Sequence, residues 1–215
     1  ITGDPVSPER ITANDAWLEP ARDRPNLTII GEALVDQVLL DDTQAVGVRV
    51  RINDAWTNIH GNEVLLAAGA VHSPAILLRS GIGPESGLPV GVGLQDHANA
   101  ILFVDYHDGH EPKTVDDRHT NCCLRYSSGL AGAGENDMMI LAMNHSPRIT
   151  TGGLLLAWVN QSFSRGALRL ASKDPTVHPI IDENMLSDRR DLERLRDATR
   201  RMWGLGRQPG FQAIV

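Results

Sequence analysis

The stretch that most constrains the fold of this chain is EVLLAAGAVHSPAILLRSGIGP at residues 63–84. Its first part, Val64 to Ala68, is continuously apolar, which is typical of a strand covered on both faces. Ser73 is expected to cap a short helix with Pro74 in its first position, and Gly81 is expected to end that helix in a left-handed conformation. The stretch therefore predicts a strand, a tight loop and a short helix.

A junction of this kind has a chemical consequence. It brings backbone amides and the N-terminus of a helix to the carboxyl edge of a sheet, where an anionic cofactor can approach without meeting side chains. A crossover that needs glycine only for close packing explains the same spacing equally well. Spacing alone leaves both interpretations open.

Upstream of this junction, residues 34–52 have the pattern of a β-hairpin. Valines and isoleucine alternate with glycine and arginine through AVGVRVRI, and DDTQ supplies the turn before this run. A second turn at Asn53 and Asp54 returns the chain toward the apolar stretch. TANDAWLEPARDRPN predicts a helix that begins at Thr12 and stops at Pro20, and LTII at residues 27–30 predicts a further strand.

Downstream, the sequence pattern predicts an antiparallel sheet and one long helix. Five runs read as strands, and Gly, Pro and Asp turns separate them. The glycine cluster in GLAGAGEND at residues 129–137 is expected to be a loop between two of these strands. The helix after LSDRRD is expected to bury one face, formed by Leu192, Leu195, Ala198 and Met202. The strand-like runs are ANAILFVDY, TNCCLRYS, DMMILAMN, LLLAWVNQ and GALRLAS.

Composition excludes two classes of partner. The chain has 215 residues, a net charge of -7 and a pI near 5.6, without the basic stripe that a nucleic acid requires or an apolar run that could span a bilayer. Cys122 and Cys123 are adjacent and do not readily adopt ordinary disulfide geometry, which favours a reducing, cytoplasmic setting. The opening ITGDPVSPER has neither an initiator Met nor a signal-peptide pattern, so we expect a piece of a longer chain.

The stretch GAVHSPAILLRSGIGP resembles the second signature of the glucose-methanol-choline (GMC) family of flavoprotein oxidoreductases. ITANDAWLEPARDRPNLTI upstream, and LPVGVGLQDH and SRGALRLASKDPTVHPIID downstream, resemble the family in the same order. The resemblance implies an α/β plus α+β fold. Residues 1–97 would form part of a Rossmann-related FAD-binding domain, and residues 98–215 would form part of an antiparallel-sheet substrate domain.

The same resemblance implies where FAD binds. Val35 takes the position whose backbone amide and carbonyl hold the adenine, Ala68 and Gly69 line the dinucleotide, and Ser73 caps the neighbouring helix. Asp96 and His97 recur in the family near the domain junction, where a buried hydrogen-bonded pair is expected. His72 sits at a variable position of the signature and receives no role.

Two parts of the family pattern have no counterpart in this sequence. The first dinucleotide fingerprint, Gly-x-Gly-x-x-Gly, is absent, and none of the eight histidines matches the catalytic histidine near the family's carboxyl end. GPESGLPVG is also about ten residues shorter than its family equivalent. No catalytic residue is therefore assigned within this chain, and the chain alone is expected to be inactive.

The resemblance also bears on the substrate. Choline-oxidising relatives present a carboxylate to the trimethylammonium group from a strand that resembles TNCCLRYS, and Leu124 takes that position here, which favours an uncharged alcohol. Glu111, Asp116 or Asp117 would compensate a cation only from a loop folded over the cavity. Trp158 could face that cavity, although a strand tryptophan is more often part of the core.

Other sequence patterns give weaker evidence about function. His107 and His110 are three residues apart but have no convincing third ligand, so no metal is expected. The serines lack the Gly-x-Ser-x-Gly context of a hydrolase nucleophile. The predicted function is FAD-dependent oxidation of a small-molecule alcohol by hydride transfer to flavin, with the electron acceptor and oligomeric state open. The alternatives are a hydroxynitrile lyase of the same fold and a non-catalytic binding module derived from the family.

Overall fold

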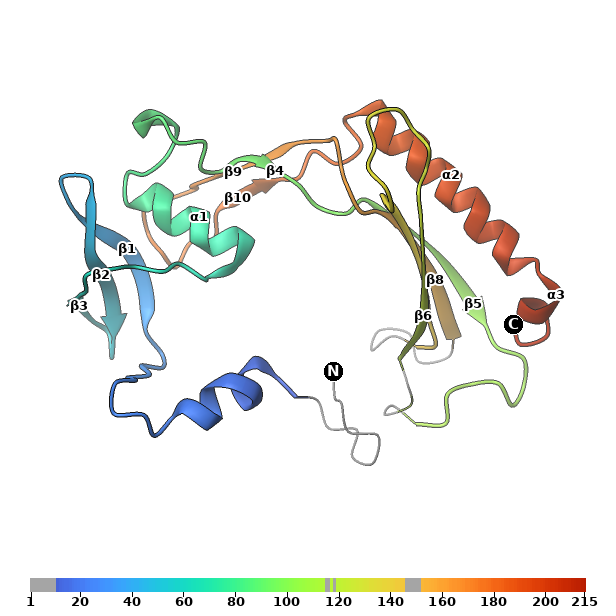
Figure 1. The fold of residues 1–215 in the computed structure, drawn as a ribbon, viewed down its shortest axis with the longest axis horizontal. Coiled ribbons are helices and arrows are strands. Elements are labelled where there is room, and N and C mark those ends of the chain that lie inside the picture. The colour runs from blue at the N-terminus through green and yellow to red at the C-terminus, as the bar shows by residue number, and fades with distance from the viewer. Residues whose placement is uncertain (1–10, 115–116, 118, 146–151) are drawn as a thin grey trace. The chain divides into compact units, whose positions relative to one another are not determined.

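The computed structural model describes residues 11–114, 117, 119–145 and 152–215. Two compact units divide the chain, and each is built from segments that are separated in sequence (Figure 1). Unit 1 comprises the residues through Gly81 together with Ser172–His178. Unit 2 comprises Ile82–Ala171 and Pro179–Val215. The domain boundary near residue 97 that the sequence indicates stays a prediction.

Unit 1 contains a three-stranded antiparallel sheet in the order β1-β2-β3. The predicted hairpin is confirmed, because its two strands pair directly. Asn53 and Asp54 both have positive φ, 49° and 60°, as a tight turn into the third strand requires. The strands are β1 (Leu34–Asp41), β2 (Gln44–Ile52) and β3 (Ala55–His60).

The N-terminal segment is helical as predicted, but the helix does not stop at Pro20. A π-helical turn, η1 (Asn14–Leu18), runs into a 3-10 turn, η2 (Glu19–Ala21). Pro20 does not stop the helix, because the first turn of a helix needs no N–H donor at that position. The strand predicted at residues 27–30 is wrong: these residues are irregular, and no described strand lies beside them to pair with.

The strand predicted from Val64 to Ala68 is also wrong in this structure. These residues run as irregular chain with no strand partner among the described residues, and Leu65 is 83% exposed. Apolar composition does not make a strand unless neighbouring strands supply the hydrogen bonds and cover the faces.

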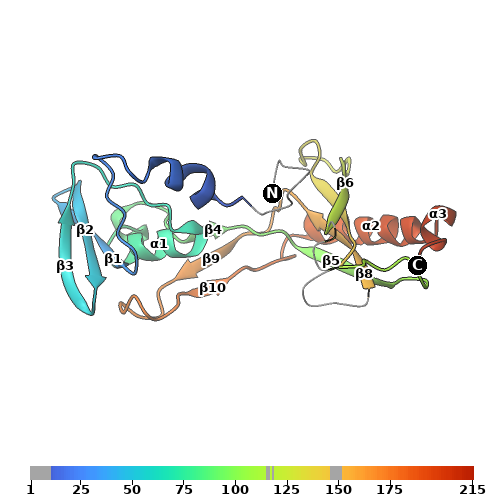
Figure 2. The same ribbon diagram turned by 90° about the horizontal axis from the view of Figure 1, so that it is seen from below.

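The helix that follows, α1 (Gly69–Arg79), begins five residues earlier than predicted, so Pro74 lies inside it. Gly81 has φ of 79°, which confirms the predicted left-handed end. The buried side of α1, with Ala75 and Ile76, faces the sheet, and Figures 1 and 2 both show the helix beside β1. Unit 1 thus packs one short helix on one small sheet.

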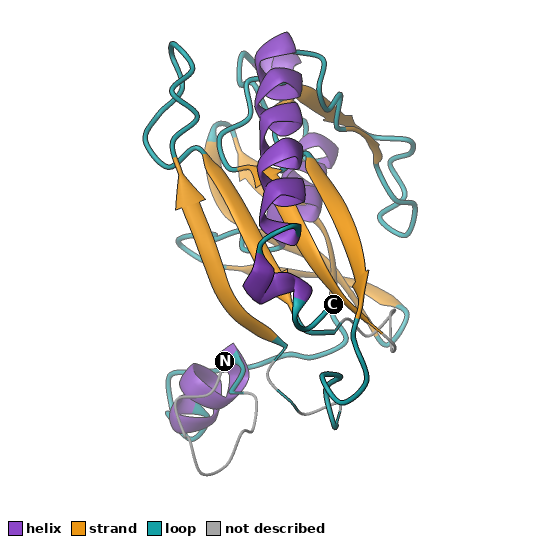
Figure 3. Cartoon of the chain, turned by 90° about the vertical axis from the view of Figure 1, so that its right-hand side faces the viewer, coloured by secondary structure: helices purple, strands orange, loops and turns teal. Residues whose placement is uncertain are grey.

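Unit 2 is built on a four-stranded antiparallel sheet in the order β5-β8-β7-β6. Four of the five predicted strand runs form this sheet. One long helix, α2 (Arg189–Gly206), crosses one face of the sheet (Figure 3). The strands are β5 (Asn99–Asp105), β6 (Thr120–Tyr126), β7 (Met138–Met143) and β8 (Gly152–Val159).

The core of unit 2 lies between α2 and the sheet. Leu195, Ala198 and Met202 of α2 are buried as predicted, but Leu192 is exposed. Two charged residues of the same helix, Asp191 and Arg194, are buried with them. The sheet side of this core consists of Ala98, Met138, Ile140, Leu155, Ala157 and Val159.

The remaining elements of unit 2 are short. A second antiparallel sheet has the order β10-β9-β4, and Figure 2 shows β9 and β10 running side by side. The glycine cluster at residues 129–137 lies between β6 and β7 as loop, as predicted. These elements are β4 (Val92–Leu94), β9 (Gly166–Arg169), β10 (Ile180–Asp182), η3 (Pro84–Ser86) and α3 (Pro209–Gln212).

Candidate functional site

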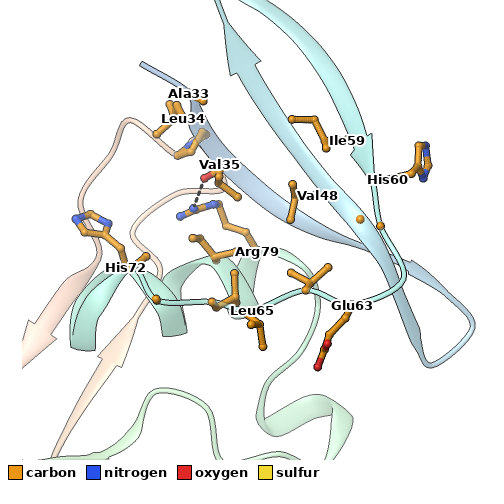
Figure 4. Close-up of a pocket in the computed structure, with 18 residues that line it drawn as sticks. Ala33, Leu34, Val35, Val48, Ile59, His60, Glu63, Leu65, His72 and Arg79 are labelled. Atoms are coloured by element: carbon orange, nitrogen blue, oxygen red, sulfur yellow. Dashed lines mark hydrogen bonds between the residues drawn. The ribbon is translucent and has the colours of Figure 1, made fainter. Parts of the chain in front are cut away.

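A groove of about 600 Å³ lies in unit 1 between the sheet, the irregular segment before α1 and α1 itself (Figure 4). Its walls are mainly aliphatic, with Val35, Val48 and Ile59 from three different strands and Leu65 from the irregular segment. His72 and Arg79 of α1 also line the groove. An apolar groove with a few polar groups suits a flat, largely apolar ligand group.

The backbone of Val35 is held from α1. Nη2 of Arg79 lies 3.5 Å from the carbonyl oxygen of Val35, and its Nε donates to the carbonyl oxygen of Asp36 at 2.9 Å. Nε also lies 3.1 Å from Oδ1 of Asp36, so the two side chains form a salt bridge that is almost completely buried. The edge of β1 at Val35 is therefore anchored to the last turn of the helix.

The start of α1 is held by its own serine. Oγ of Ser73 accepts a hydrogen bond from the backbone N–H of Ala68 at 2.9 Å, across the first turn. Gly69 has φ of 82°, a left-handed conformation that side chains disfavour, and no atom lies within 4 Å of where its Cβ would be. The first turn contains no acidic residue, so no carboxylate neutralises the positive end of the helix dipole or repels an anion there.

The predicted cofactor residues lie at the groove and in the first turns of α1. Val35 and Ala68 line the groove, and Gly69 and Ser73 follow in the first turns of α1. Their contacts with FAD stay predictions. Sequence reasoning missed Arg79 and Asp36, although an arginine that closes the apolar run AILL is a signal that could have found the first of them.

The sheet of unit 2 has two different faces. Directly opposite residues of neighbouring strands share a face, and successive residues alternate. The face turned away from α2, called the outer face below, carries Met139, Leu141, Leu156, Trp158, Ile101 and Phe103. Phe103 is 59% exposed, so a large apolar surface is presented there.

The register places Leu124 and its chain neighbours on different faces of the sheet. Leu124 lies opposite Ile140, which is buried under α2, so Leu124 is not on the outer face. Its neighbours Cys123 and Arg125 are, opposite Leu141 and Met139. Trp158 also lies on the outer face and outside the core cluster, with Nε1 donating to Oδ1 of Asn160 at 2.8 Å.

The predicted burial of Asp96 and His97 is wrong. Both residues are exposed, and the carboxylate of Asp96 accepts from the backbone N–H of His97 rather than from its ring. Nδ1 of His97 lies 2.8 Å from the carbonyl oxygen of Val159 at the end of β8. The pair caps the entry to β5 instead of forming a buried cluster.

The described loop acids Glu111 and Asp117 make local hydrogen bonds. The carboxylate of Asp117 accepts from the backbone of Lys113 and Thr114, and that of Glu111 accepts from the backbone N–H of Gly109. Asp116 lies outside the described residues. Across the described part of the chain, no three His, Cys, Asp or Glu residues are grouped as metal ligands, and no helix has the length and apolarity needed to cross a membrane.

Two comparisons connect this geometry with known proteins. Residues 6–99 and 162–213 match two descriptions of the GMC oxidoreductase family, and together these ranges cover most of the chain. The 5-(hydroxymethyl)furfural oxidase of Methylovorus sp. strain MP688 is 36% identical over 211 residues, which cover 89% of this chain and 39% of that protein. An oxygen-dependent choline dehydrogenase of Ectopseudomonas mendocina strain ymp is 30% identical, over 97% and 45% of the two chains.

Solved structures of related enzymes have a similar fold. The crystal structure of pyridoxine 4-oxidase from Mesorbium loti superimposes with a TM-score of 0.83 at 26% identity, over 97% of this chain and 45% of that chain. A fungal aryl-alcohol oxidase gives 0.73 at 20% identity and shows the same fold, over 96% and 49%. The fold is thus that of FAD-dependent flavoproteins, and the predicted fold class is confirmed. This chain belongs to the GMC oxidoreductase family, and it spans less than half the length of the relatives it matches.

The residues of unit 1 fit FAD, the cofactor of this family. Adenine is flat and apolar with a polar edge, and the groove offers aliphatic walls beside a backbone edge at Val35. The pyrophosphate is anionic, and the first turn of α1 offers backbone amides, a left-handed glycine and no opposing acid. Both ends of this donor set suit the dinucleotide.

Proposed function

We propose that this chain is the part of an FAD-dependent alcohol oxidoreductase that binds the adenine end of FAD and supplies an apolar surface for the alcohol. The observation that carries the first half is the groove in unit 1, which both Val35 and Ala68 line (Figure 4). When bound, FAD supplies the acceptor for the hydride that leaves the alcohol carbon.

The residues of this chain then have three roles. Val35 would bind the adenine edge through its backbone, Ala68 and Gly69 would let the dinucleotide approach closely, and Ser73 would hold the first turn of α1 in place. The hydrogen bond from Ala68 N–H to Ser73 Oγ supports the last role. The whole protein's base is not assigned to any residue of this chain.

The proposed substrate is an uncharged alcohol that binds on the outer face, so Leu124, which lies on the α2 face, no longer bears on the proposal. The support comes from the outer face of the unit 2 sheet, where the neighbouring row, Ile101, Leu156 and Leu141, is apolar. Asn99 lies directly opposite Trp158, and the nearest charged strand residue is the cation Arg125. Asp105 lies on the same face at the diagonally opposite corner, more than about 20 Å away by strand spacing. An ammonium group bound beside Trp158 would have no anion next to it on the described strands of this face.

The names of the relatives favour alcohol oxidation in general. One relative is named for hydroxymethylfurfural and others for choline, so the family includes a neutral and a cationic alcohol. We propose a cytoplasmic location for the protein, since Cys122 and Cys123 are both free thiols.

The test is anaerobic reduction of the complete, purified protein. Bleaching of the flavin absorbance by benzyl alcohol, with release of benzaldehyde, is the expected result. Release of cyanide from an aromatic cyanohydrin without flavin bleaching would instead identify a hydroxynitrile lyase. A colourless protein that gains no flavin on incubation with FAD would indicate the non-catalytic module.

A further inference from the structure

The buried ion pair between Arg79 and Asp36 joins two parts of the cofactor groove that are separated in sequence. Arg79 closes the helix that begins at Gly69, and Asp36 follows Val35 in β1. The two side chains are only 4% and 5% exposed. A buried pair of this kind requires good geometry to offset its desolvation, so it fixes the two elements relative to each other.

The contacts of Arg79 are directed at the β1 backbone. Its guanidinium reaches the carbonyl oxygens of both Val35 and Asp36, as well as the carboxylate. The register between β1 and β2 shifts between Val35 and Gln37, so the ladder is irregular at the point where Arg79 reaches it. A backbone edge at an irregularity is less constrained by its own sheet and depends more on other partners.

The next residue of the chain adds a second tie. Oγ of Ser80 accepts from the backbone N–H of Val38 at 2.8 Å and donates to the carbonyl oxygen of Ile76 at 2.7 Å. The end of α1 therefore holds β1 at Val35, Asp36 and Val38, while the start of α1 carries the turn proposed for the dinucleotide.

We propose that Arg79 is a positioning residue for FAD, which sets the position of the Val35 backbone relative to the first turn of α1. This inference rests on the proposed function. It places no group of Arg79 in the reaction: the guanidinium acts through Val35, and loss of its planar fork should weaken binding of the adenine half of the cofactor.

Arg49 provides a matched control. Its Nη1 lies 3.5 Å from Oδ2 of the same Asp36 carboxylate, but its side chain is 42% exposed and has no contact with the Val35 carbonyl. Arg79→Lys and Arg49→Lys therefore each disturb an ion pair with Asp36, and only the first disturbs Val35.

The experiment measures Kd values of the flavin-depleted complete protein for FAD and for AMP by calorimetry, well below the melting temperature. We expect Arg79→Lys to weaken both ligands by about tenfold or more and by the same factor, and Arg49→Lys to change them less than about twofold. Unchanged Kd values with a lower melting temperature would overturn the proposal, because a merely structural role predicts that result. Absence of FAD and AMP binding in the unsubstituted protein would instead refute the proposed function.

A second measurement needs no variant and decides the case if Arg79→Lys does not fold. Amide hydrogen exchange of the unsubstituted protein is compared with and without AMP. We expect AMP to slow exchange at residues 34–38 and at 76–80 together, because Arg79 and Ser80 couple the two segments. Protection confined to residues 34–38 would contradict the coupling.

Discussion

Arg194 of α2 and Asp137, which precedes β7, form a buried salt bridge in which Nη1 lies 2.8 Å from Oδ2. Their side chains are 2% and 0% exposed. Asp137 also accepts from the backbone N–H and the hydroxyl of Ser128, and Arg194 also binds Asp191 one turn earlier in α2. The network ties the helix to the loop between β6 and β7, on the side opposite the outer face.

Removing one partner of this network should be costly. We expect Asp137→Asn to lower the free energy of unfolding by about 3 to 5 kcal/mol, because it leaves Arg194 buried with less compensation. The exposed pair Arg201 and Asp197 is the control, and Asp197→Asn should cost less than about 1 kcal/mol. Urea titration followed by tryptophan fluorescence measures both, and equal losses would contradict the prediction.

The same network predicts a loss of stability in acid. Burial alone would raise the pKa of Asp137, but hydrogen bonds from Arg194 and Ser128 outweigh it and hold the pKa below its ordinary value of 3.8. Burial would also raise the pKa of Asp191, but hydrogen bonds from Phe163 and Ser164 outweigh burial and lower this pKa. A carboxyl whose pKa is lower when folded stabilises the protein above its unfolded pKa, and this contribution disappears as the pH falls through the folded value.

Stability should therefore be level from about pH 7 to pH 5 and fall below about pH 4. Urea titrations at several pH values measure this, and Asp137→Asn should show a shallower fall. An acid profile identical in the variant and the unsubstituted protein would assign the transition to other carboxylates.

Local pattern explains which parts of this fold could be predicted. The hairpin, the strands of the unit 2 sheet and α2 carry their own periodicity and turn residues, and all were predicted from them. The strand at Val64 to Ala68 was not found, because strand formation depends on neighbours that the described residues do not supply. The start of α1 was misplaced because Ser73 and Pro74 look like a cap, whereas Ser73 binds Ala68 from inside the helix.

The family resemblance predicted residues for the cofactor site, which stay a prediction, but it did not predict the residues that support them. Of the four residues that the family resemblance indicated, Val35 and Ala68 line the groove, and Gly69 and Ser73 lie in the first turns of α1. The residues that anchor β1 were missed, because the average behaviour of Arg and Asp places them on the surface. The same preference concealed Arg194 and favoured Leu192 as a core residue, which the helix instead exposes.

Gly69 and Gly81 provide a test of the dinucleotide approach. Both have left-handed φ, 82° and 79°, and neither has an atom within 4 Å of where its Cβ would be. Gly69→Val and Gly81→Val should therefore strain the backbone similarly, by about 1 to 2 kcal/mol. We expect only Gly69→Val to lower the flavin content of the folded protein, measured from the ratio of flavin absorbance to protein absorbance. Equal flavin content in both variants would favour a purely structural glycine.

A chain of these 215 residues alone should not retain FAD through purification. In the proposed site, its described residues provide one backbone edge for adenine and one helix start, and a site with fewer contacts than that of the complete protein should lose affinity by several powers of ten. The measurement is the flavin absorbance of the purified chain beside that of the complete protein. A yellow preparation of the short chain would show that the contacts of unit 1 are sufficient.

The neighbours Leu124 and Arg125 test the charge of the substrate, because they are adjacent in β6 and lie on opposite faces of the sheet. In the complete protein, benzyl alcohol should have the higher kcat/KM, since choline bound beside Trp158 would meet the cation of Arg125 and no carboxylate on the neighbouring described strands. Arg125→Glu should raise kcat/KM for choline relative to benzyl alcohol by about tenfold or more, because it reverses the nearest charge on the outer face. Leu124→Glu adds the same carboxylate on the α2 face and should change the ratio by less than about twofold. Steady-state kinetics with a dye acceptor give both ratios, and a larger change for Leu124→Glu would place the alcohol on the other face of the sheet.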